Sequence, residues 1–184
     1  MLNISLLPSR QKILLGLTII TGLILIICST YDLLPQNKLN KYITFYAIGV
    51  PLFLLVFDTF IDLNNKNVFI IWLTIGVIFL IVQILSSNSD KFKISRSSGF
   101  DATSKINSLI SNNSTSALKC LLFFLIVYWG LNKLLKAIKG VYLVNTFWQF
   151  SWYHDGARRE MNWLDVILNM VLFVTILTAG LFSF

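Results

Sequence analysis

One short stretch of the sequence holds most of the residue types that could carry acid–base chemistry. Residues 153–169 read YHDGARREMNWLDVILN. They include the only histidine of the chain, its only glutamate and a pair of arginines: His154, Glu160, Arg158 and Arg159. A histidine next to a carboxylate, here Asp155, could titrate near neutral pH and act as a sensor, or it could simply lie at the membrane interface.

No second group completes a catalytic or metal site. The chain has no HExxH pattern, no Ser-His-Asp order and no glycine-rich phosphate loop. Its two cysteines, Cys28 and Cys120, lie far apart in apolar runs. An aspartate pair for intramembrane proteolysis, Asp58 and Asp165, lacks an accompanying glycine motif. We therefore expect a protein that is not an enzyme and that uses no cofactor and no metal.

Helical phasing gives the stretch a different interpretation. With Asp155 as an N-cap, one helix would carry Arg158, Asn162, Asp165 and Asn169 within about 60° of one another. This polar stripe, about 16 Å long, enters an apolar run and should face protein or water, not lipid. It indicates either helix packing through amide hydrogen bonds or a functional surface. Among functional surfaces we favour a partner contact over an ion or proton path.

Two further groups complete the predicted partner and assembly residues. Asp58 and Asp62 share one helix face and could pair with the arginine pair of the stretch, or simply form an anionic helix end. Lys133, Lys136 and Lys139 recur every three residues. They could reach lipid phosphates, which we favour, or an acidic partner protein.

The composition places the chain in a membrane. Hydrophobic residues make up 56% of it, charged residues only 12%, and the mean hydropathy is +0.75. A soluble domain could not bury so much apolar surface. The net charge of +7 then fits loop cations that fix orientation and contact anionic lipid, so we expect no direct nucleic-acid binding.

Apolar runs predict the architecture, an all-α polytopic bundle of four to five transmembrane helices in one membrane domain, residues 1–184. A helix needs about 20 apolar residues to cross a bilayer. The runs that reach or approach this length are 13–34, 42–61, 68–85, 117–135 and 163–182. Polar turns, PQNKLN and DLNNKN, join the first three.

Two longer connections differ in composition. Residues 86–116 are rich in serine and asparagine and predict an exposed loop, with a short surface helix near 100–110. Residues 136–162 combine basic and aromatic side chains, which is typical of a segment at headgroup level. Because Arg10 and Lys12 precede the first run, we expect a cytoplasmic N-terminus.

The layout of the chain, together with FWQFSWYHDGARREMNWLDVILN, resembles the membrane subunit of the Kiwa anti-phage defence system. The resemblance implies a non-catalytic protein of the bacterial inner membrane that forms an oligomer. It also implies recruitment of a soluble DNA-binding partner and four spans, where this chain has five apolar runs. No functional residue of the family maps onto a position here.

We therefore predict a multi-pass inner-membrane scaffold or sensor that forms a homo-oligomer, contacts lipid and signals to a soluble cytoplasmic protein. Two alternatives stay open. One is an immunity protein that protects the membrane from a bacteriocin or toxin. The other is a small channel or transporter, for which the available polar residues would be Gln83, Asn132, Asp165 and Asn169.

Overall fold

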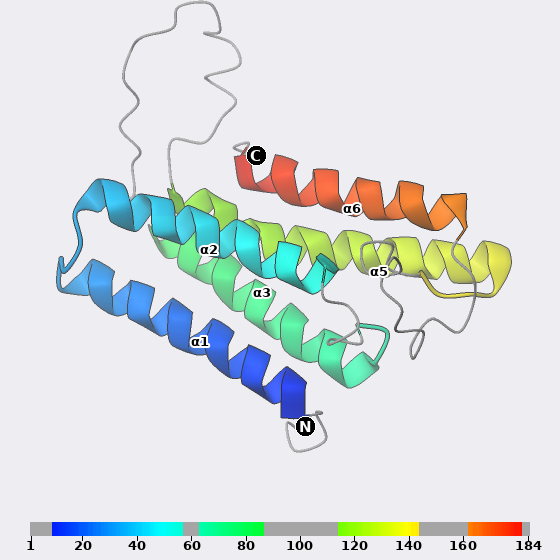
Figure 1. Cartoon of the computed structure of the whole chain (residues 1–184), viewed down its shortest axis with the longest axis horizontal. Coiled ribbons are helices and arrows are strands. Elements are labelled where there is room, and N and C mark those ends of the chain that lie inside the picture. The colour runs from blue at the N-terminus through cyan, green and yellow to red at the C-terminus, as the bar shows by residue number, and fades with distance from the viewer. Residues whose placement is uncertain (1–8, 57–62, 87–113, 144–161, 182–184) are drawn as a thin grey trace, which may run out of the picture.

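The computed structural model describes residues 9–56, 63–86, 114–143 and 162–181. These residues form five long α-helices and one short 3-10 helix, and they contain no strand (Figure 1). The elements, in chain order, are α1 (Ser9–Thr30), α2 (Gln36–Val56), α3 (Lys66–Ser86), η4 (Ser114–Leu118), α5 (Lys119–Lys139) and α6 (Trp163–Leu181). Five stretches are long and apolar enough to cross a membrane, so the chain is a multi-pass membrane protein.

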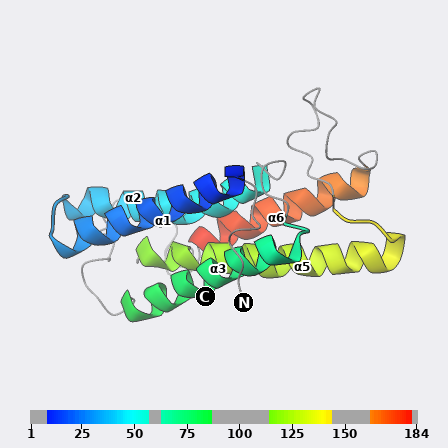
Figure 2. The same cartoon turned by 90° about the horizontal axis from the view of Figure 1, so that it is seen from below.

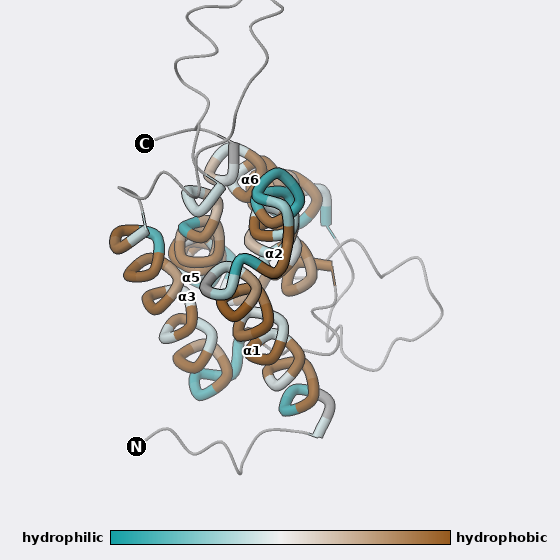
Figure 3. The backbone as a smooth tube through the Cα atoms, turned by 90° about the vertical axis from the view of Figure 1, so that its left-hand side faces the viewer, coloured by the Kyte–Doolittle hydropathy of each residue, from teal (hydrophilic) through white to brown (hydrophobic). Residues whose placement is uncertain are grey.

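The α-helices run up and down along one axis, each antiparallel to the next (Figure 1). We call end A the end at which α1, α3 and α6 begin and α2 and α5 finish, and end B the opposite end. Helix α5 packs against α2, α3 and α6, whereas α1 packs mainly on α2. Figure 2 shows α3 beside α5, with α1 and α2 in the opposite layer. Apolar residues dominate every helix in Figure 3, as the bilayer requires.

Helix α1 ends earlier than the apolar run suggests. Helix α1 ends at Thr30, four residues before the expected limit, because Asp32 adopts a left-handed conformation with φ of 49°. The N–H of Leu33 then donates to the carbonyl of Cys28 at 3.1 Å, which closes the helix end. Pro35 follows, and its carbonyl accepts the N–H of Lys38 at 2.9 Å as α2 begins.

The predicted exposed loop 86–116 differs from the structure at both of its ends. Ser86 belongs to α3, and residues 114–116 are buried in η4. The Oγ of Ser114 donates to Oδ1 of Asn40 at 3.0 Å, so this polar turn packs against α2 inside the bundle. Lys119 is also only 3% exposed. The short helix expected near 100–110 lies outside the described residues.

Helix α5 continues beyond the expected limit at residue 135 and ends at Lys139. Gly140 is its C-cap, with φ of 69°, and its N–H donates to the carbonyl of Lys136 at 2.9 Å. Lysines do not end a membrane helix, because their long side chains can reach the headgroup level. The first part of the predicted headgroup segment 136–162 is therefore helical.

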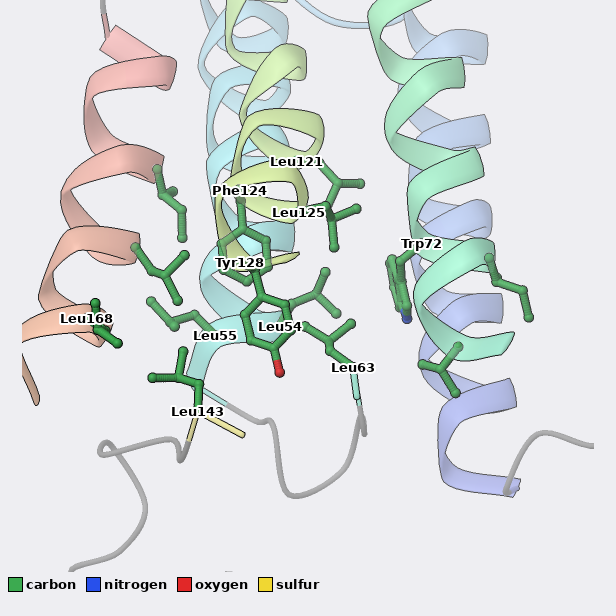
Figure 4. Close-up of a cluster of buried hydrophobic side chains, with 14 of the residues drawn as sticks. Leu54, Leu55, Leu63, Trp72, Leu121, Phe124, Leu125, Tyr128, Leu143 and Leu168 are labelled. Atoms are coloured by element: carbon green, nitrogen blue, oxygen red, sulfur yellow. The ribbon is translucent and has the colours of Figure 1, made fainter. Parts of the chain in front are cut away.

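Glycines allow the closest helix contacts of the bundle. A Cβ atom on Gly76 of α3 would lie 3.3 Å from the backbone N and Cα of Leu122 in α5. On α6, a Cβ atom on Gly180 would lie 2.9 Å from Ile48 and 3.0 Å from the sulfur of Cys120. The main hydrophobic core, which includes Leu54 and Phe124, is buried between the helices (Figure 4).

We predict that Gly76→Leu destabilises the bundle by about 1–3 kcal/mol, because the backbones of α3 and α5 must move apart. Gly130→Leu is the matched control, since Gly130 is exposed on α5 with nothing within 4 Å of an added Cβ. Unfolding of both variants by denaturant in detergent micelles measures the difference. Equal stabilities would contradict the close approach of the two helices.

Candidate functional site

Polar side chains gather at end A, where the turn before α3, the last turns of α5 and the start of α6 meet. Within the bundle, Asn132 is buried and Asp165 is completely buried. A polar atom that is buried without a partner is costly, so each of these groups needs a partner from the protein. The hydrogen bonds of this region therefore determine what the site can do.

A hydrogen-bond network centres on Asn132. Its Nδ2 donates to Oδ1 of Asn64 at 3.1 Å, and the hydroxyl of Tyr128 donates to the same oxygen at 3.3 Å. Its own Oδ1 accepts the backbone N–H of Leu143 at 2.8 Å. We call this set of groups the Asn132 network. An amide suits the position because it donates and accepts at the same time. The network joins α5 to the turn before α3 and to the segment after α5.

The residues after α5 turn back onto the bundle as a hook, residues 140–143. The left-handed Gly140 reverses the chain, and Leu143 inserts into the core, where it is 4% exposed. Figure 4 shows Leu143 near Leu55 at the edge of the core. Tyr142 remains at the surface, where its hydroxyl accepts a hydrogen bond from Nζ of Lys136 at 2.8 Å.

The side chains of Asp165 and Asn162 both accept backbone N–H groups at the start of helix α6. The carboxylate of Asp165 accepts the backbone N–H of Asn162 at 2.9 Å, and the carbonyl of Asn162 accepts the N–H of Asp165 at 2.8 Å. Oδ1 of Asn162 also accepts the N–H of Trp163 at 2.8 Å. A carboxylate at this position satisfies a free N–H group and complements the positive end of the helix dipole.

This start corrects one sequence expectation. Because Asn162 is the cap and α6 begins at Trp163, a single helix does not carry the whole stripe from Arg158 to Asn169. Asn162 is exposed, whereas Asp165 and Asn169 face the bundle interior. Local capping by Asn162 explains the later start, since its side chain stabilises a helix beginning at the next residue.

A small cavity lies between the Asn132 network and the buried polar residues of α6, Asp165 and Asn169. Asn169, whose Nδ2 donates to the carbonyl of Asp165 at 2.8 Å, lines it from α6. Tyr128 of the Asn132 network lines it from α5, and apolar side chains form the rest of its wall. The volume is about 10 Å³, which matches about one water molecule. The interior of end A is thus packed, with no room for a substrate at this point.

The three predicted lysines of α5 are exposed outside this interior. Nζ of Lys133 lies 4.9 Å from the ring centroid of Trp129, and Nζ of Lys136 lies 4.8 Å from that of Tyr142. Lys139 occupies the last turn of the helix, where a cation complements the negative end of its dipole. End A therefore places amides and a carboxylate inside and ammonium groups outside.

The remaining predicted residues lie outside the described residues. They are Asp58, Asp62, Arg158 and Arg159. His154 and Glu160, in the same stretch of sequence as the two arginines, lie outside the described residues as well. The proposed pairing of aspartates with arginines stays a prediction, and so does the assignment of all ten partner and assembly residues. Among the described residues, no group of three His, Cys, Asp or Glu side chains could hold a metal ion.

Sequence reasoning did not identify Asn64, Tyr128 or Leu143 as part of the site. Asn64 belongs to a turn sequence, DLNNKN, and nothing in it indicates a partner 68 positions away. The one available signal was Asn132, a lone amide within an apolar run. Such an amide predicts a buried hydrogen bond, although it does not identify the partner.

We predict that Asn132→Leu destabilises the protein by about 1–3 kcal/mol, because the N–H of Leu143 and the side chain of Asn64 lose a partner. Asn67→Leu, at an exposed asparagine near the same end, serves as the control and should change stability little. Denaturant unfolding in detergent measures both. If Asn132→Leu is as stable as the control, the network does not hold the hook.

Comparison of the chain with protein-family models, with curated proteins and with solved structures found no match.

Proposed function

We propose that the chain is a non-catalytic membrane scaffold that presents residues 144–161 at one membrane face to a soluble partner protein. One observation carries the proposal: both neighbours of this segment are fixed to the bundle. Leu143 is held by Asn132 and by burial in the core. Asn162 is held by Asp165. Because α5 and α6 pack directly on each other, the two attachment points belong to one packed pair of helices.

Fixed attachment favours recognition. A segment whose two ends are already ordered loses less conformational entropy on binding than a free chain. The segment also has the composition of a binding surface, with Trp148, Trp152 and the pair Arg158 and Arg159. Tryptophan and arginine are the side chains that most often dominate binding energy at interfaces.

The distribution of polar groups favours a scaffold over a channel. Of the four residues that a conduction path could use, Asn132, Asp165 and Asn169 lie toward end A, within a packed interior. Gln83 lies near the last turn of α3, toward end B. A path across the membrane would need polar groups along the whole length of the helices. Buried polar groups also lie at end B, such as Asn40 and Ser114, but the core between the two ends is built of apolar side chains.

We further propose that end A is cytoplasmic and that the membrane is a bacterial inner membrane. Among the described residues, five lysines are exposed at end A, namely Lys12, Lys66 and the three lysines of α5, whereas only Lys38 and Lys41 are exposed at end B. Lys119, which the sequence would count toward the other face, is buried instead. Cytoplasmic segments carry the excess of positive charge in such membranes. A homo-oligomer and a role in anti-phage defence belong to the same proposal and rest on the resemblance described above.

Replacement of both arginines tests the docking segment. We predict that Arg158→Ala with Arg159→Ala lowers the retention of a soluble partner at least tenfold, because each arginine of a binding hot spot contributes about 2 kcal/mol or more. The measurement is quantitative mass spectrometry of proteins that co-purify with the tagged chain in mild detergent.

Lys38→Ala with Lys41→Ala provides the matched control, since both lysines are exposed near the start of α2 at end B. The control should retain the partner at the level of the unmodified chain. The docking proposal fails if every soluble protein retained by the unmodified chain is retained equally by the double arginine variant.

A further inference from the structure

We infer that Lys133 and Lys136, with Trp129 and Tyr142, form a binding site for the headgroup of an anionic phospholipid on the outer face of α5. This site is separate from the docking segment of the proposed function and does not depend on it. Its support comes from the level of these residues in the membrane, from the geometry of the two ammonium groups and from the charge around them.

The register of the helices places the site at headgroup level. Gly76 of α3 lies against Leu122 of α5. Because the two helices are antiparallel, ten residues toward end A lead from Gly76 to Lys66 and from Leu122 to Asn132. Lys133 is therefore level with Lys66, the first residue of α3.

Helix α6 gives the same level independently. The thiol of Cys120 in α5 donates to the carbonyl of Ile176 at 3.6 Å. Thirteen residues toward end A lead from Ile176 to Trp163 and from Cys120 to Lys133. Trp163 is 81% exposed at the first position of α6. Tryptophan and lysine side chains that meet at one level mark the boundary between hydrocarbon and headgroups.

Each of the two ammonium groups lies over an aromatic ring. The Lys133 ammonium lies over the exposed ring of Trp129, one turn nearer the membrane centre, and the Lys136 ammonium lies over the ring of Tyr142. The Lys136 group uses one of its three N–H donors on the Tyr142 hydroxyl. Within the described residues, its other two donors have no partner and can bind an oxygen ligand. Residues three apart on a helix have Cβ atoms about 5–6 Å apart, and lysine side chains are long and flexible, so both ammonium groups can turn from their rings toward one headgroup.

The charge around the site selects an anion. Neither ammonium forms an ion pair with a carboxylate of the described residues. Asp165, the nearest acidic residue of the described part of α6, is completely buried and caps its own helix. Trp129 lies about 6 Å deeper than Lys133 along the helix, where its ring can meet the glycerol region of a lipid whose phosphate meets the lysines.

A membrane lipid fits this arrangement better than an acidic protein does. Trp129 and its exposed neighbour Ile126 continue the face into the apolar part of α5. A soluble partner cannot follow the face to that depth, whereas an acyl chain can. Each lysine near an anionic membrane surface contributes about fivefold to binding. Two lysines therefore predict a clear preference for anionic over zwitterionic lipid.

Tryptophan quenching by brominated lipids tests the site. Trp148, Trp152 and Trp163 are replaced by Phe, which leaves Trp129 and the buried Trp72. The same chain with Trp129→Phe gives the Trp72 signal for subtraction. In phosphatidylcholine vesicles, brominated phosphatidylglycerol should bind beside Trp129 at least fivefold better than brominated phosphatidylcholine. Lys133→Gln with Lys136→Gln should reduce this ratio to about one.

Two further variants make the result specific. Lys133→Arg with Lys136→Arg preserves the charge and should preserve the preference, which also shows that the altered site still folds. Lys38→Gln at end B should leave the ratio unchanged. A ratio near one in the parent chain would overturn the lipid site and leave the lysines to an acidic protein. A preference that survives the double Gln change would overturn it as well.

Discussion

The cost of burying a polar atom without a hydrogen-bond partner is the constraint on which this structure depends. A polar atom that the packed helices shield from water is stable only if the protein itself supplies a partner. The Asn132 network meets this demand at end A, where a single amide satisfies Asn64 on one side and the backbone of Leu143 on the other. The same bonds that remove the cost of a buried amide also fix where the chain leaves α5.

At end A, the buried polar side chains and the exposed lysines therefore have different partners. Asp165 and Asn169 are inside the bundle and use their hydrogen-bonding groups on the start of α6. Lys133 and Lys136 are outside and use theirs on aromatic rings and, by our inference, on lipid. Between the fixed residues Leu143 and Asn162 lies the proposed docking segment. A packed interior, a rim of exposed lysines and a segment attached at both ends are what the proposed membrane scaffold requires.

The helices could be predicted from the sequence because long apolar runs have few other structures available in a membrane. Some limits could not, since they depend on local geometry: the left-handed Asp32 ends α1 early. The apolar run 163–182 did predict α6, but the longer helix expected from Asp155 was wrong, because Asn162 caps α6 at Trp163. The burial of residues 114–116 was also missed, because a serine-rich segment is ordinarily exposed and its partner, Asn40, is distant in sequence. For the site, Asn132 was visible as an anomaly, but Asn64 and Leu143 required the tertiary structure.

Amide hydrogen exchange at Leu143 tests most directly whether one buried side chain fixes the base of the docking segment. We predict that this N–H, bonded to Asn132 at 2.8 Å, exchanges as slowly as amides within α5. In Asn132→Leu it should exchange at least tenfold faster, while amides in the middle of α5 keep their protection. Fast exchange of Leu143 in the unmodified protein, at the rate of an open loop, would contradict the account.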